Sequence, residues 1–239
     1  MINIKKYKVM SFDLDNTLYD NVPVLEKAEQ ALFLFLQEKL TPQRIPPLSW
    51  WIDLSIHLLN QHNSLEHDIT ALRKLTLYEG IGQIAKTLTQ DEIKTLVNDG
   101  MSVFMDWRNK IVIGSEVNHV LMMLKKKYRL VIITNGNAQP QLFMPNYSAL
   151  FDMTFFAGQH GKKKPHVDLF SQCCEYCNIQ PNELIHVGDM LEDDVYGAKK
   201  YGADAIWLRH SAPLIKNQKY IADLEITDLV QLLTIFVEQ

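Results

Sequence analysis

The sequence predicts an α/β protein in which a doubly wound parallel sheet is interrupted by an inserted all-helical domain. Short apolar runs alternate with helical patterns in the second half of the 239-residue chain, as they do in parallel sheets with crossover helices. One further apolar run, at residues 8–12, lies near the N-terminus. Residues 21–110 contain no convincing strand, so the first strand is expected to join a sheet built mainly by the second half.

The inserted block, which we place at residues 19–110, is predicted to consist of helices. Apolar residues at helical spacing predict helices over residues 24–36, 48–60 and 64–88. Thr89 and Glu92 have the spacing of a capping box, so a fourth helix is expected to begin there.

The flanking segments, residues 1–18 and 111–239, are predicted to form one discontinuous α/β core. Further strands are expected over residues 130–134, 153–157, 184–188 and 205–208. Helices are expected over residues 115–124, 167–177, 193–201 and 227–237. Ser115 is a candidate N-cap for the first of these helices, and Gly202 is expected to end the third.

Composition and charge exclude several classes of protein. With 47% hydrophobic and 22% charged residues, the chain has an ordinary globular composition. The formal net charge is −4 and no long basic stretch occurs, so nucleic acid is not an expected partner. No apolar run is long enough to cross a membrane, and the N-terminal residues lack the apolar region of a signal peptide. A cytoplasmic protein without a membrane partner is therefore expected.

The cysteines do not point to a metal or redox site. All three lie together, at Cys173, Cys174 and Cys177, and the last two form a CxxC in sequence that reads as a helix. Because no second pair accompanies them, a zinc or redox function is not favoured.

The first apolar run ends in two aspartates, Asp13 and Asp15. The chain is expected to turn at Leu14, so that both carboxylates reach one pocket at the carboxyl end of the strand, where open α/β sheets bind ligands. Clustered carboxylates suit Mg²⁺, which prefers oxygen ligands, and a carboxylate can also act as a covalent nucleophile. The alternative is a turn in which the aspartates merely end the strand.

Three other segments bring polar side chains to the same edge of the predicted sheet. Thr134 and Asn135 follow the second strand, Lys164 lies in the loop after the third, and Asp189 ends the fourth, with Asp194 soon after. Taken singly, each has a structural explanation: a turn, a solvated run of lysines, or acidic residues at a helix N-terminus. Because the carboxyl ends of parallel strands share one edge, their coincidence favours a functional site.

Together these residues resemble the four motifs of the haloacid dehalogenase (HAD) superfamily, in order. The motifs are Asp13-Leu-Asp15-Asn-Thr17, Thr134, Lys164 and Gly188-Asp189 with Asp194. The resemblance covers essentially the whole chain and implies a HAD-like Rossmannoid core with an inserted α-helical cap of the C1 type. Most members of that superfamily are Mg²⁺-dependent phosphatases, so the resemblance implies a phosphoric monoester hydrolase.

The resemblance also implies the roles of the acidic residues. Asp13 would be the nucleophile that forms an aspartyl-phosphate, and Asp15 the general acid and then the base toward water. Mg²⁺ would be bound by Asp13, by the backbone carbonyl of Asp15 and by Asp189. Asp194 would steady the metal through a water molecule or hold Lys164, the lysine of the third motif.

The remaining motif residues would bind and neutralise the phosphoryl group. Thr134 and the backbone amide of Asn135 would donate to its oxygens, and Lys164 would offset the charge on Asp13 and the phosphate. Thr17 and Gly188 would support the site.

Asp15 also separates the chemistries found in the superfamily. True dehalogenases and phosphonatases lack an acid at this position, because their leaving groups need no proton. The presence of Asp15, followed by Thr17, therefore favours phosphate esters. A 2-haloacid dehalogenase and a non-catalytic binding module on the same scaffold are the alternatives from other classes.

A closer resemblance points toward a substrate. The segments around Asp15–Asp20, Ile133–Pro140, Ala157–Gly161 and His186–Asp189 resemble the bacterial phosphatases of flavin biosynthesis. Their substrate is 5-amino-6-(5-phospho-D-ribitylamino)uracil, a precursor of riboflavin and FMN. Related phosphatases often accept several sugar phosphates and nucleotides, so a broad-specificity enzyme is the alternative.

The cap is expected to select the substrate, although most of its candidate residues are expected in its core. The residues best suited to meet a pyrimidine or a ribityl chain are Trp50, Trp51, His57, Tyr78, Trp107 and Arg108. His160 is expected either to line the entrance or to stabilise its loop, and His186 to be a core histidine with satisfied hydrogen bonds. A monomer and a homodimer are equally compatible with the sequence.

Overall fold

The computed structural model describes residues 3–210 and 221–238. The chain forms two compact units. The first, the sheet unit, contains the residues up to Asp20, Val112–Gly136, and the residues from Pro140 onward. The second, the helical unit, contains Asn21–Ile111 together with the short segment Asn137–Gln139. The sequence gives no sign that this short segment belongs with the helices.

The sheet unit is built on six parallel strands in the order β3-β2-β1-β4-β5-β6. The strands are β1 (Val9–Phe12), β2 (Arg129–Thr134), β3 (Phe151–Phe156), β4 (Leu184–Gly188), β5 (Asp204–Leu208) and β6 (Leu224–Ile226). The α/β fold expected from the alternating pattern is thus confirmed, with β6 as an additional edge strand. β1 lies near the centre between β2 and β4, although most of the other strands lie more than a hundred residues away in sequence.

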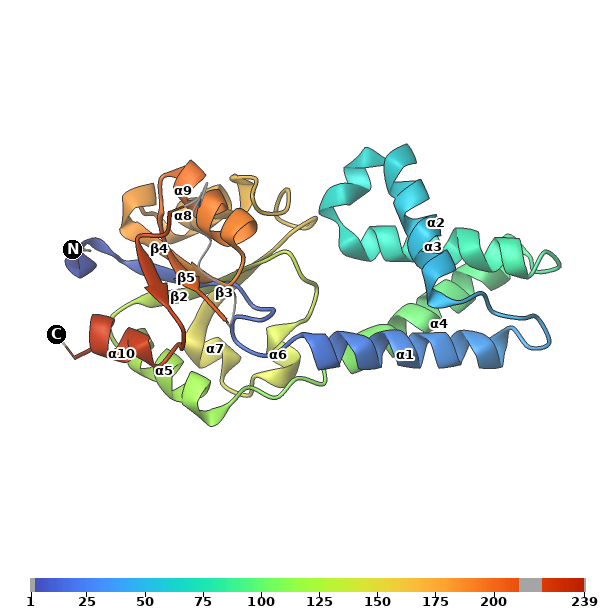
Figure 1. Ribbon diagram of the computed structural model, residues 1–239, viewed down its shortest axis with the longest axis horizontal. Coiled ribbons are helices and arrows are strands. Elements are labelled where there is room, and N and C mark those ends of the chain that lie inside the picture. The colour runs from blue at the N-terminus through green and yellow to red at the C-terminus, as the bar shows by residue number, and fades with distance from the viewer. Residues whose placement is uncertain (1–2, 211–220, 239) are drawn as a thin grey trace. The chain divides into compact units, whose positions relative to one another are not determined.

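Helices cover both faces of this sheet (Figure 1). On one face lie α8 (Asp168–Cys177) and α9 (Gly197–Tyr201), and on the other lie α5 (Ser115–Lys125), α7 (Tyr147–Leu150) and α10 (Gln231–Phe236), with α6 (Pro140–Phe143) near α7. All four residues of β1 are buried, as strands covered on both faces must be. One continuous apolar cluster joins the sheet to α8 and α9, and it includes the three cysteines.

Of three helix ends predicted in the sheet unit, one is confirmed and two are wrong. Gly202 ends α9 in the left-handed conformation with φ of 99°, as predicted. Ser115, in contrast, is not an N-cap, because the helix begins at Ser115 itself and Gly114 occupies the cap position. The helix expected from residue 193 instead begins as a π-helical turn over Leu191–Tyr196.

The helical unit consists of α1 (Val22–Lys39), α2 (Leu48–Gln61), α3 (Ile69–Ile84) and α4 (Gln90–Arg108). The capping box at α4 is confirmed: Thr89 Oγ1 accepts from the Glu92 amide at 3.3 Å, and Glu92 Oε2 accepts from the Thr89 amide at 2.7 Å. The single helix expected over residues 64–88 is wrong. A 3₁₀ turn, Asn63–His67, precedes α3, because the Asp68 side chain accepts from the Ala71 amide at 2.9 Å and starts a new helix.

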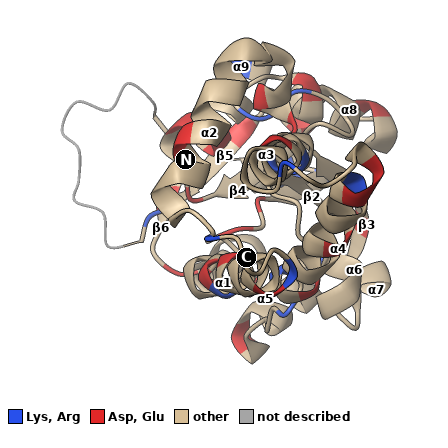
Figure 2. Cartoon of the chain, turned by 90° about the vertical axis from the view of Figure 1, so that its right-hand side faces the viewer, with Lys and Arg blue, Asp and Glu red and all other residues tan. Residues whose placement is uncertain are grey.

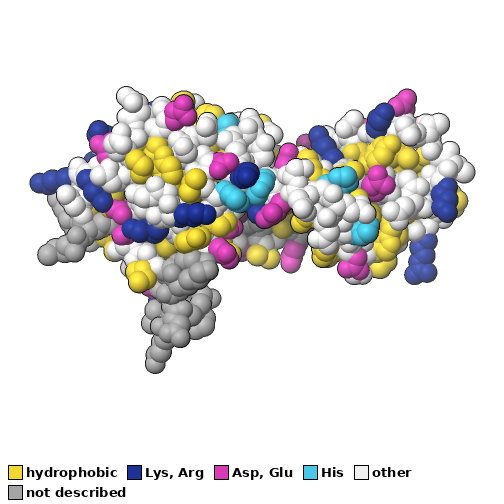
Figure 3. Space-filling view, turned by 90° about the horizontal axis from the view of Figure 1, so that it is seen from above, with side chains coloured by type: hydrophobic (Ala, Val, Ile, Leu, Met, Phe, Trp, Pro, Cys, Tyr) yellow, Lys and Arg dark blue, Asp and Glu magenta, His cyan; other side chains and the backbone are white. Residues whose placement is uncertain are grey.

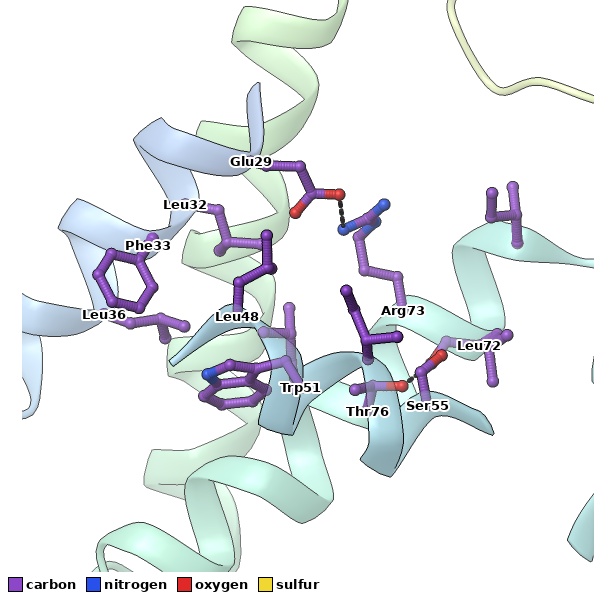
Figure 4. Close-up of a pocket in the computed structure, with 13 residues that line it drawn as sticks. Glu29, Leu32, Phe33, Leu36, Leu48, Trp51, Ser55, Leu72, Arg73 and Thr76 are labelled. Carbon is purple, nitrogen blue, oxygen red and sulfur yellow. Dashed lines mark hydrogen bonds and ion pairs between the residues drawn. The ribbon is translucent and has the colours of Figure 1, made fainter. Parts of the chain in front are cut away.

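The helical unit contains an apolar pocket of about 280 Å³ between α1, α2 and α3 (Figure 4). An ion pair of 2.8 Å between Glu29 and Arg73 lies at one side of it, and Trp51 lies at another. Leu48 and Ile52 line the pocket and are about half exposed. Apolar side chains also gather on the face of this unit seen from above in Figure 3.

Two further observations bear on the classes of protein considered above. Acidic and basic residues are interspersed on both units (Figure 2). Within the described residues, no helix combines the length and apolar character needed to cross a membrane.

Candidate active site

The two aspartates follow the carboxyl end of β1 and line the same cavity. The Asp13 amide donates to the Val187 carbonyl at 2.8 Å, so the β1–β4 pairing continues up to the nucleophile candidate. The turn lies at 16–18 rather than at Leu14. Alternate residues of an extended chain share a face, so Asp13 and Asp15 reach the same pocket without a turn between them. Asn16 then turns the chain with a φ of 59°, which asparagine tolerates.

Lys164 lies at the centre of the site and is almost completely buried, with 1% of its surface exposed. Its Nζ donates to Asp13 Oδ1 at 2.6 Å, to Asp194 Oδ1 at 2.6 Å and to the Ile133 carbonyl at 2.8 Å. All three ammonium protons therefore have acceptors. Burial would lower the pKa of Lys164, but the two carboxylates outweigh it and raise the pKa above its usual value. The lysine carries its charge at any physiological pH.

The pKa values of the two carboxylates beside Lys164 shift in opposite directions, although burial acts to raise both. Burial raises the pKa of Asp13 well above its usual value, although Lys164 opposes this. Burial also acts to raise the pKa of Asp194, but Lys164 and a hydrogen bond from His186 hold it well below the usual range. Asp194 therefore stays ionised, whereas burial disfavours the ionised form of Asp13.

The position of Asp194 depends on the π-helical turn and on Gly188. Both the Asp194 and the Val195 amides donate to the Met190 carbonyl, and the Met190 amide donates back to Asp194 Oδ2 at 2.9 Å. A Cβ on Gly188 would lie 2.2 Å from Asp194 Cγ, so a side chain there would displace the carboxylate. Gly188 thus supports the site by leaving room for Asp194.

Asp189 lies beside this group at the end of β4. Among the described residues, carboxylate oxygens of Asp13, Asp189 and Asp194 lie within 4.8 Å of one another. Burial, and then the charge of Asp194, raises the pKa of Asp189 to about 6. Thr17 Oγ1 donates to Asp189 Oδ1 at 3.5 Å, and the Trp207 indole donates to the Asp189 carbonyl at 2.9 Å.

Hard oxygen donors in such a cluster fit Mg²⁺. Because Asp194 already accepts hydrogen bonds on both oxygens, Asp13 and Asp189 are the better side-chain ligands.

The second and third motifs meet through side-chain contacts that the sequence does not reveal. The Asn135 side chain donates to the Lys164 carbonyl at 3.0 Å and accepts from the Lys164 amide at 2.7 Å, so it fastens the Lys164 loop to β2. It also donates to Asp193 Oδ2 at 3.1 Å. Thr134 is buried, and its Oγ1 accepts from the Gly136 amide at 3.0 Å. Among the described residues, the Thr134 hydroxyl has no hydrogen-bond acceptor for its own proton.

A cavity of about 130 Å³ collects these groups. It is lined by Asp13, Asp15, Asn16, Thr134, Asn135, Gly136, Lys164, Asp189, Met190, Asp193 and Asp194. A Cβ on Gly136 would lie 2.4 Å from Asp15 Oδ2, so this wall of the cavity needs a glycine. The structure thus brings together every residue proposed for catalysis, phosphate binding and metal binding. The roles of these residues remain predictions.

Some residues around the site escaped the sequence reasoning. The Tyr19 hydroxyl donates to Asp15 Oδ1, and the indole of Trp207 contacts the Asp189 backbone. The Asp15–Tyr19 spacing of four residues could have suggested the first contact, whereas nothing in the sequence brings Trp207 to Asp189.

Other candidate residues have structural roles. His160 accepts from the Phe156 amide at 2.9 Å and stacks on its ring, which favours the loop-stabilising interpretation. The cysteines are buried free thiols, and none joins a candidate metal cluster in the described residues. Of the cap candidates, Trp51 and Arg108 are buried in the helical unit, Trp50 and Tyr78 are partly buried, and His57 and Trp107 are exposed. Contact of any of them with a substrate stays a prediction.

The family of the chain follows from comparison with known proteins. Residues 7–202 match the model of haloacid dehalogenase-like hydrolases. The chain belongs to this family. Its parallel α/β sheet agrees with the fold that the resemblance implied, and the four motifs line one cavity.

Curated relatives of the chain are phosphatases. It is 32% identical to the 5-amino-6-(5-phospho-D-ribitylamino)uracil phosphatase YigB of Escherichia coli (strain K12), over 95% of both chains. It is 25% identical to the N-acylneuraminate-9-phosphatase of Mus musculus, over 88% of this chain and 86% of that protein. The chain is accordingly an enzyme, a phosphatase of the haloacid dehalogenase-like family.

A solved structure of similar fold is named for a different activity. The crystal structure of a 2-haloacid dehalogenase from Pseudomonas syringae pv. Tomato DC3000 has a TM-score of 0.88 and 30% identity, and covers 97% of this chain and 99% of its own. Both chemistries are therefore represented among similar proteins, and residues of the site must distinguish them.

Proposed function

We propose that this chain is a Mg²⁺-dependent phosphatase that hydrolyses a small phosphorylated metabolite through an aspartyl-phosphate on Asp13. The observation that carries the proposal is the buried Lys164 ammonium, 2.6 Å from both Asp13 and Asp194, beside the carboxylate of Asp189. A fixed cation next to clustered carboxylates suits the transfer of a phosphoryl group between oxygens, because charge on that group must be offset throughout.

The metal would supply a second positive charge beside the phosphoryl group. Asp13, Asp189 and the backbone carbonyl of Asp15 would hold it, in line with the hard oxygen donors of the cluster. Its presence would also favour the ionised form of Asp13, whose pKa burial raises in the metal-free site.

The reaction would take place in two steps. A carboxylate oxygen of Asp13 attacks phosphorus, the bond from phosphorus to the ester oxygen breaks, and Asp15 gives its proton to the departing alkoxide. Asp15, now ionised, takes a proton from water as that water attacks phosphorus, which releases phosphate and restores Asp13. Thr134 and the backbone amide of Asn135 would donate to the phosphoryl oxygens during both steps, and Lys164 would offset the charge on Asp13 and the phosphoryl group.

Tyr19 would help to prepare Asp15 for this alternation. Its hydroxyl donates to Asp15 Oδ1, whereas Oδ2 faces Gly136. The contact orients the carboxyl group, as a catalytic acid requires.

For the substrate, we propose 5-amino-6-(5-phospho-D-ribitylamino)uracil in riboflavin and FMN biosynthesis. The similarity to YigB over 95% of both chains supports it. Other relatives are named for glyceraldehyde 3-phosphate and phosphoglycolate, so a broad specificity for sugar phosphates and nucleotides is the alternative. We further propose a cytoplasmic enzyme without nucleic-acid or membrane partners, active as a monomer or homodimer.

Dehalogenation remains a second candidate because of the structural similarity described above. Asp15 argues against it: a departing halide needs no proton, whereas an alkoxide does. A dehalogenase would release halide from 2-chloropropionate in the presence of EDTA. The phosphatase should release none and should hydrolyse p-nitrophenyl phosphate only with Mg²⁺.

The mechanism is tested by Asp13→Asn, with Glu175→Gln as the control. Both changes remove one carboxylate, but Glu175 is exposed on α8, outside the cavity. Asp13→Asn should lower Mg²⁺-dependent turnover of p-nitrophenyl phosphate by about a thousandfold or more while circular dichroism shows a folded protein. Undiminished turnover in Asp13→Asn would contradict the mechanism.

The substrate is tested separately by comparing kcat/KM over a panel of phosphorylated metabolites that includes the ribitylaminouracil phosphate. We expect the highest value for that compound. If simple sugar phosphates are turned over better, the broad-specificity alternative holds.

A further inference from the structure

Behind Asp194 lies a chain of buried hydrogen bonds that the proposed mechanism does not use. Ser11 Oγ lies 2.8 Å from His186 Nδ1, and His186 Nε2 lies 3.1 Å from Asp194 Oδ1. Ser11 and His186 are completely buried, and Asp194 is 1% exposed. The pairing of β1 with β4 places Ser11 directly opposite His186. The contact is therefore built into the centre of the sheet.

The direction of the hydrogen bonds follows from the chemistry of the partners. An ionised carboxylate only accepts, and Lys164 keeps Asp194 ionised, so His186 Nε2 must carry the proton. Burial, reinforced by the nearby Lys164 charge, lowers the pKa of His186, so the ring is neutral. Nδ1 of a neutral ring with a proton on Nε2 is an acceptor. The hydroxyl of Ser11 therefore donates to Nδ1, at 2.8 Å, rather than to the Ile185 carbonyl, which lies 3.5 Å away.

We propose that Ser11 and His186 are positioning residues for catalysis, which fix the Asp194 carboxylate and through it direct Lys164 at Asp13. The proposal rests on the phosphatase mechanism above for its last link. It assigns two buried polar residues to the reaction although neither lines the cavity.

Three hydrogen bonds hold the Asp194 carboxylate in place. Oδ2 accepts from the Met190 amide, and Oδ1 is shared between Lys164 and His186. Without the imidazole donor, one side of Oδ1 would lose its partner, and the carboxylate could rotate toward Lys164. Because the same lysine holds Asp13 at 2.6 Å, any such rotation moves the ammonium relative to the nucleophile. A hydrogen bond donated from outside the cavity can therefore affect turnover, because its acceptor, Asp194, lines the cavity.

The alternative is that His186 only fills space. Its ring lies edge-on to Phe170, with centroids 5.1 Å apart, so it does contribute to packing. Packing alone requires volume and shape, whereas positioning requires a donor directed at Asp194. Two substitutions separate these requirements.

The kinetic test compares His186→Leu with His186→Gln on the full chain, with Mg²⁺ and p-nitrophenyl phosphate. Both remove the ring, but the glutamine amide can still donate to Asp194. We expect His186→Leu to lower kcat by about ten- to a hundredfold, the value of one charge-assisted hydrogen bond, at a temperature where both variants are folded. His186→Gln should recover most of that loss. Equal losses in both variants, or no loss in His186→Leu, would overturn the proposal.

A second readout does not depend on activity. Imidazole ¹⁵N NMR of the protein with Mg²⁺ should show one ring in the neutral Nε2–H form over the whole pH range in which the protein stays folded, and that signal should be missing in His186→Gln. Ser11→Ala should shift its Nδ1 resonance, because the donor to that atom is removed. An Nδ1–H form or a protonated ring would overturn the proposal. If instead Asp13→Asn retains turnover, the phosphatase mechanism fails while the NMR result stands.

Discussion

The charge of Lys164 is solvated entirely by protein oxygens. With 1% of its surface exposed, the side chain has replaced water by two carboxylates and one backbone carbonyl. Such an arrangement is stable only as a whole, because removing one member leaves the opposite charges buried without partners. The residue proposed to offset charge in the reaction is therefore also a structural residue of the sheet unit.

Lys164→Met tests both the catalytic and the structural role of this lysine. It preserves the length of the side chain but leaves Asp13 and Asp194 without their cation. We expect turnover of p-nitrophenyl phosphate to fall by about a hundredfold or more and the free energy of unfolding to fall by roughly 3–5 kcal/mol in urea titrations. Lys162→Met, at an exposed position of the same loop, should leave both nearly unchanged. A stable, active Lys164→Met protein would refute this account.

Gly188→Ala should damage the site without changing any charged group. The added Cβ would collide with Asp194 Cγ at 2.2 Å, so the carboxylate must move away from Lys164 and His186. We expect a drop in kcat of about tenfold or more, since the hydrogen bonds to Asp194 are charge-assisted. Gly114→Ala is the control, because nothing lies within 4 Å of its added Cβ. Full kcat in Gly188→Ala would show that Asp194 need not stay in place.

At the scale of elements, the sequence predicted the strands better than the turns. The four central strands were predicted correctly because a strand that is covered on both faces is buried along its length and therefore reads as a continuous apolar run. β6 was missed because Leu224–Ile226 is short and contains Glu225, as edge strands do. The break at Asp68 and the π-helical turn at Leu191–Tyr196 depend on individual side-chain and backbone contacts, which periodicity does not encode.

The candidate site was predictable for a related reason. Asp13, Thr134, Lys164 and Asp189 each lie at or near a strand end, and the topology of a parallel sheet brings such ends together. The contacts of Asn135 with the Lys164 backbone were not predictable, because they join two loops 29 residues apart. The same holds for Ser11 and His186, whose pairing depends on strand order and register.

The packing of α2 against α3 gives a prediction at this scale. A Cβ on Gly80 would lie 2.2 Å from the Trp51 ring, whereas one on Gly82 would meet its nearest neighbour at 3.7 Å. Gly80→Ala should lower the free energy of unfolding by about 1–3 kcal/mol through overpacking. Gly82→Ala should raise it by up to about 1 kcal/mol, because alanine favours the helix. Thermal unfolding of the two variants should therefore shift in opposite directions.

The proposed metal ligand Asp189 would make metal binding depend on pH. Burial raises its pKa to about 6 in the metal-free protein, and the metal needs the ionised form. We expect the Mg²⁺ affinity, measured by calorimetry, to fall by about tenfold per pH unit below pH 6. Asp189→Asn should weaken binding at every pH and reduce this dependence. An affinity independent of pH between 5 and 7 would contradict the assignment of Asp189 as a ligand.

The raised pKa of Asp189 also makes the stability of the metal-free protein depend on pH. The folded, metal-free protein holds the Asp189 proton up to about pH 6, whereas the unfolded chain releases it near 3.8. This contribution to stability is present in acid and is lost as the pH rises through about 6. Asp189→Asn should therefore raise the melting temperature of the metal-free protein more at pH 7 than at pH 5. Mg²⁺ should remove that advantage, because it stabilises the parent protein.

The segment Asn137–Gln139 makes the helical unit harder to remove than its place in the sequence suggests. The Asn137 side chain donates to Thr70 at 3.0 Å, and the Gln139 amide donates to Asn109 at 2.7 Å. The backbone therefore crosses between the units four times rather than twice. A shortened enzyme made by deleting residues 21–111 would expose this segment, which directly follows Thr134–Gly136. Engineers who seek a minimal catalytic core, or who exchange caps between relatives, would need to transplant these three residues together with the helices.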